Sequence, residues 1–210
     1  MGKTTMETRA FDFEIRAEKR EDGVGQIVGR PIVYDSPTDL GEFTEVIAKG
    51  ALDRANLKDV RFLVNHNTAM IPLARSRNNN SNSTMQMRVG SEGMDIRVDL
   101  DVDNNTDAKN LYSAIERGDI SGMSFMFLIE EEKWSNLKSE HPTRTITKIS
   151  DVFEVSAVTW PAYESTSIGI RDIQALESAK AALESARKSL ESEERAKALE
   201  EFNNKWRVKQ

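Results

Sequence analysis

Hydrophobic and polar positions alternate with a period of two along much of the chain before residue 160, a pattern typical of half-buried β-strands. This alternation predicts strands at residues 10–17, 26–34, 61–64, 85–89, 94–102 and 144–150. The fourth and fifth of these are joined by Gly-Ser-Glu-Gly and form a predicted β-hairpin. Residues 151–161 are apolar on both faces, as expected of a central strand. Gly29 and Pro31 indicate a bulge or an edge within the second strand.

Helical spacing appears in three places. Residues 104–118 place Ala108, Leu111, Tyr112 and Ile115 on one face and end at Gly118, which predicts a helix. A short helix is expected at residues 49–55. From residue 171 the strand alternation stops, and strong helix formers predict a long helical tail. Its apolar seam is Leu176, Ala179, Leu183, Ala186 and Leu190, with a further patch at Phe202 and Trp206. The seam fits a coiled coil or a helix docked on its own domain.

The remaining segments are polar. Residues 1–8 are expected to be frayed, residues 77–84 to form a surface loop, and residues 130–143 to make a polar excursion between strands.

Composition excludes several classes of function. A length of 210 residues indicates one domain with an appendage. The net charge of −6 argues against a nucleic-acid binder, which needs a basic face. The absence of a long apolar run argues against a membrane protein, and no leader suggests secretion. The lack of cysteine removes disulfides, cysteine nucleophiles and thiolate metal sites.

A serine and a histidine are the first candidates for chemistry. Ser124 follows Gly122 and opens an apolar strand, which suits a nucleophile, but a serine needs a base to take its proton. Of the two histidines, His141 lies in a polar, turn-like segment. His66 follows the strand at residues 61–64, at a strand-to-loop junction where functional residues are common. Taken alone, either residue is more readily explained by a structural role than by catalysis.

Glu154 is a carboxylate within the predicted central strand, where an unpaired charge is costly. It could orient His66 and stabilise its protonated form, as the acid of a Ser-His-acid triad does. It could equally be a structural carboxylate bonded to Arg, Lys or backbone N–H groups. Spacing alone leaves both interpretations open.

Four segments, taken in order, resemble the prohead maturation proteases of tailed bacteriophages, a family related in fold to the herpesvirus capsid maturation protease. They are Leu-Val-Asn-His-Asn at residues 63–67, Ile-Pro-Leu at 71–73, Gly-Asp-Ile-Ser-Gly-Met-Ser-Phe at 118–125 and Phe-Glu-Val-Ser-Ala-Val-Thr-Trp-Pro-Ala-Tyr at 153–163. The resemblance extends over about residues 10–172. The family often has Gly in place of Met126 and Leu-Gly in place of Leu73-Ala74, differences that concern the substrate cleft.

The resemblance implies a serine endopeptidase of the Ser-His-Glu type that cleaves scaffold and capsid-protein sequence, and itself, during prohead maturation. Carried over by position, His66 would be the general base, Ser124 the nucleophile and Glu154 the third member. The implied fold is α+β, with a compact antiparallel β-barrel-like core similar to the herpesvirus protease, a few helices and a C-terminal helical tail. Residues 9–170 would form the protease domain, and residues 171–210 a tail used in assembly or removed by self-cleavage.

The implied partners are the major capsid protein and its scaffolding segment, and a homo-oligomer is expected. The implied location is the host cytoplasm, inside the assembling procapsid. No cofactor, metal, nucleic acid or membrane is expected.

Two other classes of function remain open. A catalytically inactive structural assembly protein is one, because phage tail-tube proteins are thought to share this fold. It would explain the strands but not the coincidence of Ser124, His66 and Glu154. A metal-dependent hydrolase using His66 is disfavoured because the chain lacks paired-His and His-x-x-Glu spacing.

Overall fold

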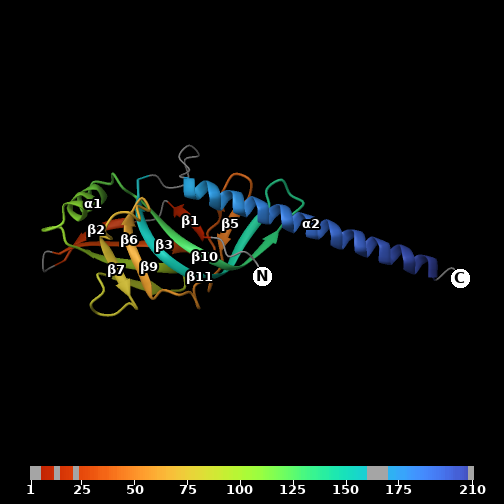
Figure 1. Cartoon of the computed structure of the whole chain (residues 1–210), viewed down its shortest axis with the longest axis horizontal. Helices are drawn as coiled ribbons and strands as arrows, with labels where there is room; N and C mark the ends of the chain where they lie inside the picture. The colour runs from red at the N-terminus through yellow and green to blue at the C-terminus, as the bar shows by residue number, and fades with distance from the viewer. Residues whose placement is uncertain (1–5, 12–14, 21–23, 160–169, 208–210) are drawn as a thin grey trace.

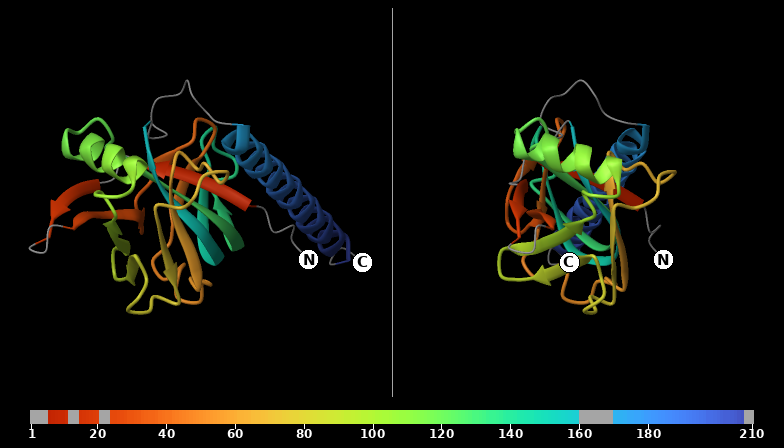
Figure 2. Two further views of the ribbon diagram at one scale, coloured as in Figure 1. Left: turned by 60° about the vertical axis from the view of Figure 1, so that its left-hand side comes forward. Right: turned by 90° about the vertical axis from the view of Figure 1, so that its left-hand side faces the viewer.

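The computed structural model describes residues 6–11, 15–20, 24–159 and 170–207 (Figure 1). It contains a seven-stranded sheet, a four-stranded sheet and two helices, α1 (Thr106–Glu116) and α2 (Ile170–Arg207). The two helices lie at opposite ends of the strands, and α2 extends away from them (Figures 1 and 2). The described chain is therefore α+β and mostly strand, with a C-terminal helix as predicted.

The seven-stranded sheet is built around two long antiparallel strands. Its members are β1 (Met6–Phe11), β4 (Thr38–Asp39), β5 (Thr44–Ile47), β6 (Asp59–Val64), β7 (Ala74–Arg77), β10 (Gly122–Ser135) and β11 (Thr143–Val158). One edge of β10 pairs with β1 and the other with β11. The second edge of β11 pairs first with β5 and then with β6, both in parallel. Strand β11 is therefore central, as its apolar sequence predicts.

The four-stranded sheet is antiparallel throughout. Its strands, in spatial order, are β2 (Ile15–Lys19), β3 (Gly25–Val33), β9 (Gly93–Leu100) and β8 (Met85–Val89). The predicted hairpin is β8–β9, and the predicted bulge is confirmed by a register shift between Gly29 and Ile32. Side chains from both sheets join one hydrophobic core, which includes Ile27 and Met94 from this sheet and Phe62 and Phe125 from the larger one.

The expected antiparallel, barrel-like core is wrong in two respects. The described strands form two separate sheets that do not close into a barrel, and β11 is parallel to β5 and β6. Alternation along a strand identifies its buried face, but not the direction or identity of its neighbours. The segment expected as one strand at residues 10–17 is likewise divided between β1 and β2, which lie in different sheets.

Three local predictions are also wrong. Residues 6–8 belong to β1, although they were expected to be frayed. Residues 49–54 form turns where a short helix was expected at residues 49–55, with Gly50 at φ +84°. Strand β10 continues to Ser135, where a polar excursion was expected, because its charged side chains find partners on β11. Lys148 pairs with Glu131 in this way.

Helix α1 directly precedes β10 in the chain and is fixed at both ends by local features. Asn105 caps its N-terminus, with its side chain accepting hydrogen bonds from two backbone N–H groups of the first turn. The helix buries Ala108, Leu111 and Ile115, which confirms the predicted apolar face. The helix ends at Glu116, and Gly118, just after the C-cap residue Arg117, has a φ of +78°, a conformation that favours glycine.

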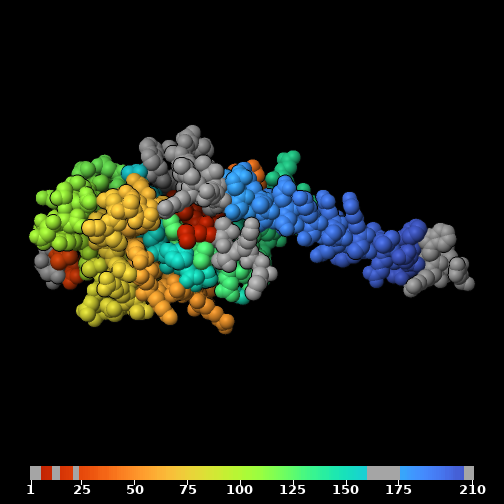
Figure 3. All heavy atoms as spheres, viewed as in Figure 1, coloured from red at the N-terminus to blue at the C-terminus, as the bar shows by residue number. Residues whose placement is uncertain are grey.

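Helix α2 is divided between a docked part and a protruding part. Ala179 and Leu183 of the predicted seam are buried where α2 packs beside β1. Arg187 donates hydrogen bonds to two carbonyls of the β10–β11 loop. Glu194 also pairs with Lys138 of this loop, at 2.6 Å. The C-terminal part of α2 stands clear of the sheets (Figure 3), and Leu199 and Phe202 are more than half exposed. The side chain of Trp206 lies outside the described residues, and neither described helix is long and apolar enough to cross a membrane.

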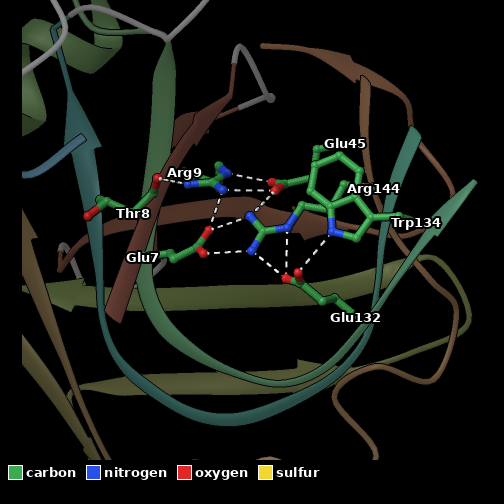
Figure 4. Close-up of polar contacts among 7 residues, drawn as sticks. All are labelled: Glu7, Thr8, Arg9, Glu45, Glu132, Trp134 and Arg144. Carbon is green, nitrogen blue, oxygen red and sulfur yellow. Dashed lines mark hydrogen bonds and ion pairs between the residues drawn. The ribbon is translucent and has the colours of Figure 1, made fainter. Parts of the chain in front are cut away.

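A buried network of charged side chains attaches β1 to the rest of its sheet (Figure 4). Its buried members are Glu7 and Arg9 of β1, Glu45 of β5 and Arg144 of β11. The partly buried Glu132 of β10 also accepts hydrogen bonds from Arg144 and from the indole N–H of Trp134. Arg9 donates to Glu7 and Glu45, and its Nη2 lies 2.8 Å from Glu45 Oε2. Arg144 Nη2 lies 2.8 Å from Glu7 Oε1, and Arg144 Nη1 lies 3.0 Å from Glu45 Oε2.

Opposite charges keep this network ionised despite its burial. Burial alone would lower the pKa of Arg9, but attraction to Glu45 and Glu7 outweighs it and raises that pKa above its ordinary value. Burial alone would raise the pKa of Glu45, but Arg9 and then Arg144 lower it below its ordinary value. The network therefore contributes to stability only while its members are complete and charged.

Replacing Arg9 with alanine is expected to lower the free energy of unfolding by about 3–5 kcal/mol, because buried carboxylates lose a counter-ion. The control is Arg30→Ala, which breaks a half-exposed ion pair to Asp95 of 2.6 Å and should cost at most about 1 kcal/mol. Urea unfolding followed by circular dichroism measures both. Similar, small losses for the two variants would contradict the assigned role of the network.

The lowered pKa of Glu45 also predicts a loss of stability in acid. A carboxyl group whose pKa is lower in the folded chain stabilises it above the unfolded-state pKa, which has an ordinary value of 4.5 here. That contribution is lost as the pH falls through the lower, folded-state value. Urea unfolding of the wild type and Glu45→Gln from pH 7 to pH 3 should show a smaller pH-dependent loss in the variant. Parallel stability curves for the two proteins would contradict this assignment.

Candidate active site

His66 lies in a strained turn at the end of β6, the strand-to-loop junction predicted from the sequence. Asn65 and His66 both have left-handed backbone conformations, with φ values of +50° and +54°. Such conformations are uncommon for residues other than glycine and often occur at functional sites. The Asn65 N–H donates to Ala157 O at 2.9 Å, and Asn65 Oδ1 accepts from the Thr159 N–H at 3.0 Å. These bonds hold the turn over the end of β11.

The structure brings His66 and Glu154 together. His66 Nδ1 lies 2.5 Å from Glu154 Oε1. Glu154 is almost fully buried, whereas 16% of the His66 side chain is exposed. When the neutral imidazole carries its proton on Nδ1, that N–H donates to the carboxylate and Nε2 remains as an acceptor. This is the arrangement that a general base and its orienting acid require.

Ser156 completes the polar contacts of this pair. It lies two residues after Glu154, on the same face of β11, and is fully buried. Its hydroxyl donates to Glu154 Oε2 at 2.5 Å and accepts the backbone N–H of His66 at 3.2 Å. Each carboxylate oxygen of Glu154 therefore has a polar partner. The sequence interpretation did not single out Ser156, although the strand period of two places it beside Glu154.

Ser124 lies one strand away from this group. It is paired directly with Ser156 across β10 and β11, and with Ala10 across β10 and β1. Paired residues of neighbouring strands point to the same face, with Cβ atoms about 5 Å apart. The Ser124 hydroxyl is fully buried and donates to Arg9 O at 2.7 Å. Within the described residues, no hydrogen bond joins Ser124 to His66.

The other histidine, His141, has a different environment and is more exposed than His66. His141 lies on an exposed turn, where its Nε2 is 3.4 Å from Asp39 Oδ1. Across the parts of the chain that the structure describes, no three or more His, Asp or Glu side chains are grouped so that they could hold a metal ion.

An apolar cavity of about 670 Å³ opens beside the His66 turn. Its walls come from β6, the loop after it, α1 and the residues before β10, and include Leu63, Leu73, Leu111 and Ile120. Ile71, at the cavity, is 85% exposed. Concave apolar surfaces of this size, close to a few polar groups, are typical of ligand-binding sites.

Comparison with known proteins gives these residues a family context. The sequence model of the caudovirus prohead serine protease family matches residues 11–180. Among solved structures, the capsid assembly protease gp21 of bacteriophage T4 shares 14% identity, with a TM-score of 0.39. That likeness covers 74% of this chain and 99% of gp21, but it is too distant to support conclusions about this chain. No curated protein matches significantly.

The family match covers most of the chain and includes all three candidate residues, Ser124, His66 and Glu154. It confirms the resemblance that the four sequence segments indicate. The chain belongs to the caudovirus prohead serine protease family.

Proposed function

We propose that this chain is an active serine endopeptidase, with Ser124 as the nucleophile, His66 as the general base and Glu154 as the acid that orients His66. The observation that supports this most strongly is the 2.5 Å contact between His66 Nδ1 and the buried carboxylate of Glu154. In a family of serine proteases, such a contact is what a catalytic base requires.

In the proposed reaction, His66 Nε2 takes the Ser124 proton as the hydroxyl oxygen attacks a peptide carbonyl carbon. The peptide C–N bond then breaks, and His66 returns the proton to the leaving amine. Water, activated by His66, hydrolyses the resulting acyl-enzyme ester and releases Ser124. Glu154 stabilises the imidazolium formed in both steps.

Under this proposal the described conformation is a resting one. The Ser124 hydroxyl must turn from Arg9 O toward His66, and its surroundings must open to admit a peptide. Rotation about χ1 between staggered positions is a small change for a serine. The apolar cavity beside the His66 turn would then take an apolar side chain of the substrate.

The proposed substrates are the major capsid protein with its scaffolding segment, and this chain itself. We place the reaction inside the assembling procapsid in the host cytoplasm, with the protease acting as a homo-oligomer. Residues 9–170 would form the protease domain. The tail at residues 171–210 would serve in assembly or be cut away, and its protruding end exposes Leu199 for contacts.

A catalytically inactive assembly protein of the same fold is the second candidate. The observation that favours it is the Ser124 hydroxyl, which is buried and bonded to Arg9 O. The two candidates predict different results for the same substitution.

Ser124→Ala is expected to abolish processing while the fold is retained, because the nucleophile is lost and residual activity would be at least about 10³-fold lower. Wild type and variant are co-expressed with the capsid protein and its scaffolding segment, and intact masses are measured. The control is Ser121→Ala, which changes an exposed serine three residues earlier and should process normally.

Equal processing by wild type and Ser124→Ala would contradict the assignment of the nucleophile. Uncleaved capsid protein in every sample would favour the inactive assembly protein. The masses of this chain itself report whether the tail is removed, and an intact C-terminus in an actively processing sample would contradict self-cleavage there.

A further inference from the structure

We propose that Ser156 is a positioning residue for the proteolytic reaction, holding both Glu154 and the backbone of His66 so that the imidazole stays in its productive orientation. The expected effect of Ser156 on catalysis rests on the proposed function. Its expected effect on the orientation of His66 depends only on the contacts among His66, Glu154 and Ser156.

Ser156 makes a hydrogen bond to each member of the His66–Glu154 pair. Its hydroxyl donates to Glu154 Oε2 at 2.5 Å, while the other carboxylate oxygen faces His66 Nδ1. The same hydroxyl oxygen accepts the His66 N–H at 3.2 Å. A single buried side chain thus connects the backbone of the base to the side chain of its acid.

A hydroxyl is well suited to this position. It offers one donor and two acceptor lone pairs, and here it uses both functions at once. Alanine would leave Glu154 Oε2 without its donor and the His66 N–H without its acceptor. Because Glu154 and Ser156 are almost inaccessible to water, the lost bonds would be poorly replaced by solvent.

The backbone of His66 makes this anchor important. His66 and Asn65 are consecutive left-handed residues, a conformation that persists only when the surroundings hold it. Asn65 is fixed to Ala157 and Thr159, and His66 to Ser156. All these partners belong to the end of β11 or directly follow it. Ser156 therefore fixes His66, the second residue of the turn, as Ala157 and Thr159 fix Asn65, the first.

Ser156 is not itself placed as a nucleophile. It contacts Glu154, on the Nδ1 side of the imidazole, whereas the proton acceptor of the proposed reaction is Nε2. Its effect must therefore pass through Glu154 and His66. A serine that served only to pack β11 would leave the ring of His66 unaffected when replaced.

The test compares full-length wild type with Ser156→Ala, Ser156→Thr and Ser76→Ala. Ser156→Thr retains the hydroxyl. Ser76 provides the matched control, because it is fully buried on β7 and its hydroxyl has no hydrogen-bond partner among the described residues. Proton NMR of histidine-labelled protein gives few signals, since the chain has only two histidines. His141, on its exposed turn, is the internal reference.

In the wild type, the Nδ1 proton of His66 should give a downfield resonance and its backbone N–H should exchange slowly. Ser156→Ala should weaken or remove that resonance and speed exchange of the His66 N–H about tenfold or more. Ser156→Thr and Ser76→Ala should keep both properties, and His141 should be unchanged throughout. An unaltered His66 in Ser156→Ala would overturn the inference.

Catalysis provides the second readout. With capsid protein as substrate, kcat should fall about ten- to a hundredfold in Ser156→Ala, as expected for hydrogen bonds to a charged group, while KM changes little. Ser156→Thr should recover most of this loss. Wild-type kcat in Ser156→Ala would overturn the inference.

These readouts separate failure of the inference from failure of the proposed function. A wild type that cleaves nothing would refute the proposed function, and the NMR comparison would still decide whether Ser156 positions His66. If Ser156→Ala did not fold, Ser156→Cys would replace it, because a thiol has similar size but is a weak donor and acceptor. The same loss of the His66 signals would be expected, and their retention would contradict the inference.

Discussion

The antiparallel pairing of β10 with β11 is the interaction on which the rest of the structure depends. It places Ser124 opposite Ser156, and so one strand away from Glu154 and His66. Because side chains alternate between faces, a slip of one residue would move Ser124 to the face occupied by Phe125 in the core. The other edge of β11 carries β6, whose end holds His66. Strand β11 therefore carries Glu154 and pairs with both strands that position Ser124 and His66.

Strand β1 links this arrangement to the buried charge network. The Arg9 side chain joins Glu7, Glu45 and Arg144, while the Arg9 carbonyl accepts the Ser124 hydroxyl. Buried ion pairs are weak evidence for net stability, because desolvation offsets much of their attraction. What this network requires is one position for β1, since any other would leave buried charges without partners. Because the Ser124 hydroxyl is bonded to the Arg9 carbonyl, the environment of Ser124 depends on the position of β1.

Much of this could be predicted from the sequence because it depends on local patterns. Alternation identified the β8–β9 hairpin, helical spacing and Gly118 identified α1, and the junction after β6 identified His66. That Glu154 needs a polar partner could also be predicted, since an unpaired carboxylate in an apolar strand is costly. Spacing left open whether that partner is His66, and it is the structure that places His66 Nδ1 beside its carboxylate.

The rest depends on which strands become neighbours, and local patterns do not contain that information. The parallel pairing of β11 with β5 and β6 could not be predicted, nor could the extension of β10 through charged residues that are paired on β11. The bond from Ser124 to Arg9 O joins residues 115 positions apart and requires the β1–β10 register. Ser156 could have been identified from its spacing to Glu154, but its contact with the His66 backbone depends on the β6–β11 pairing.

The central claim is that Ser124, His66 and Glu154 act as one catalytic unit. The most direct test is to treat the full-length protein with a fluorophosphonate, which reacts with activated serines, and to locate the adduct by peptide mass mapping. We expect the adduct on Ser124, and its loss when His66 is replaced by alanine. An unmodified Ser124, or labelling that persists without His66, would contradict the claim.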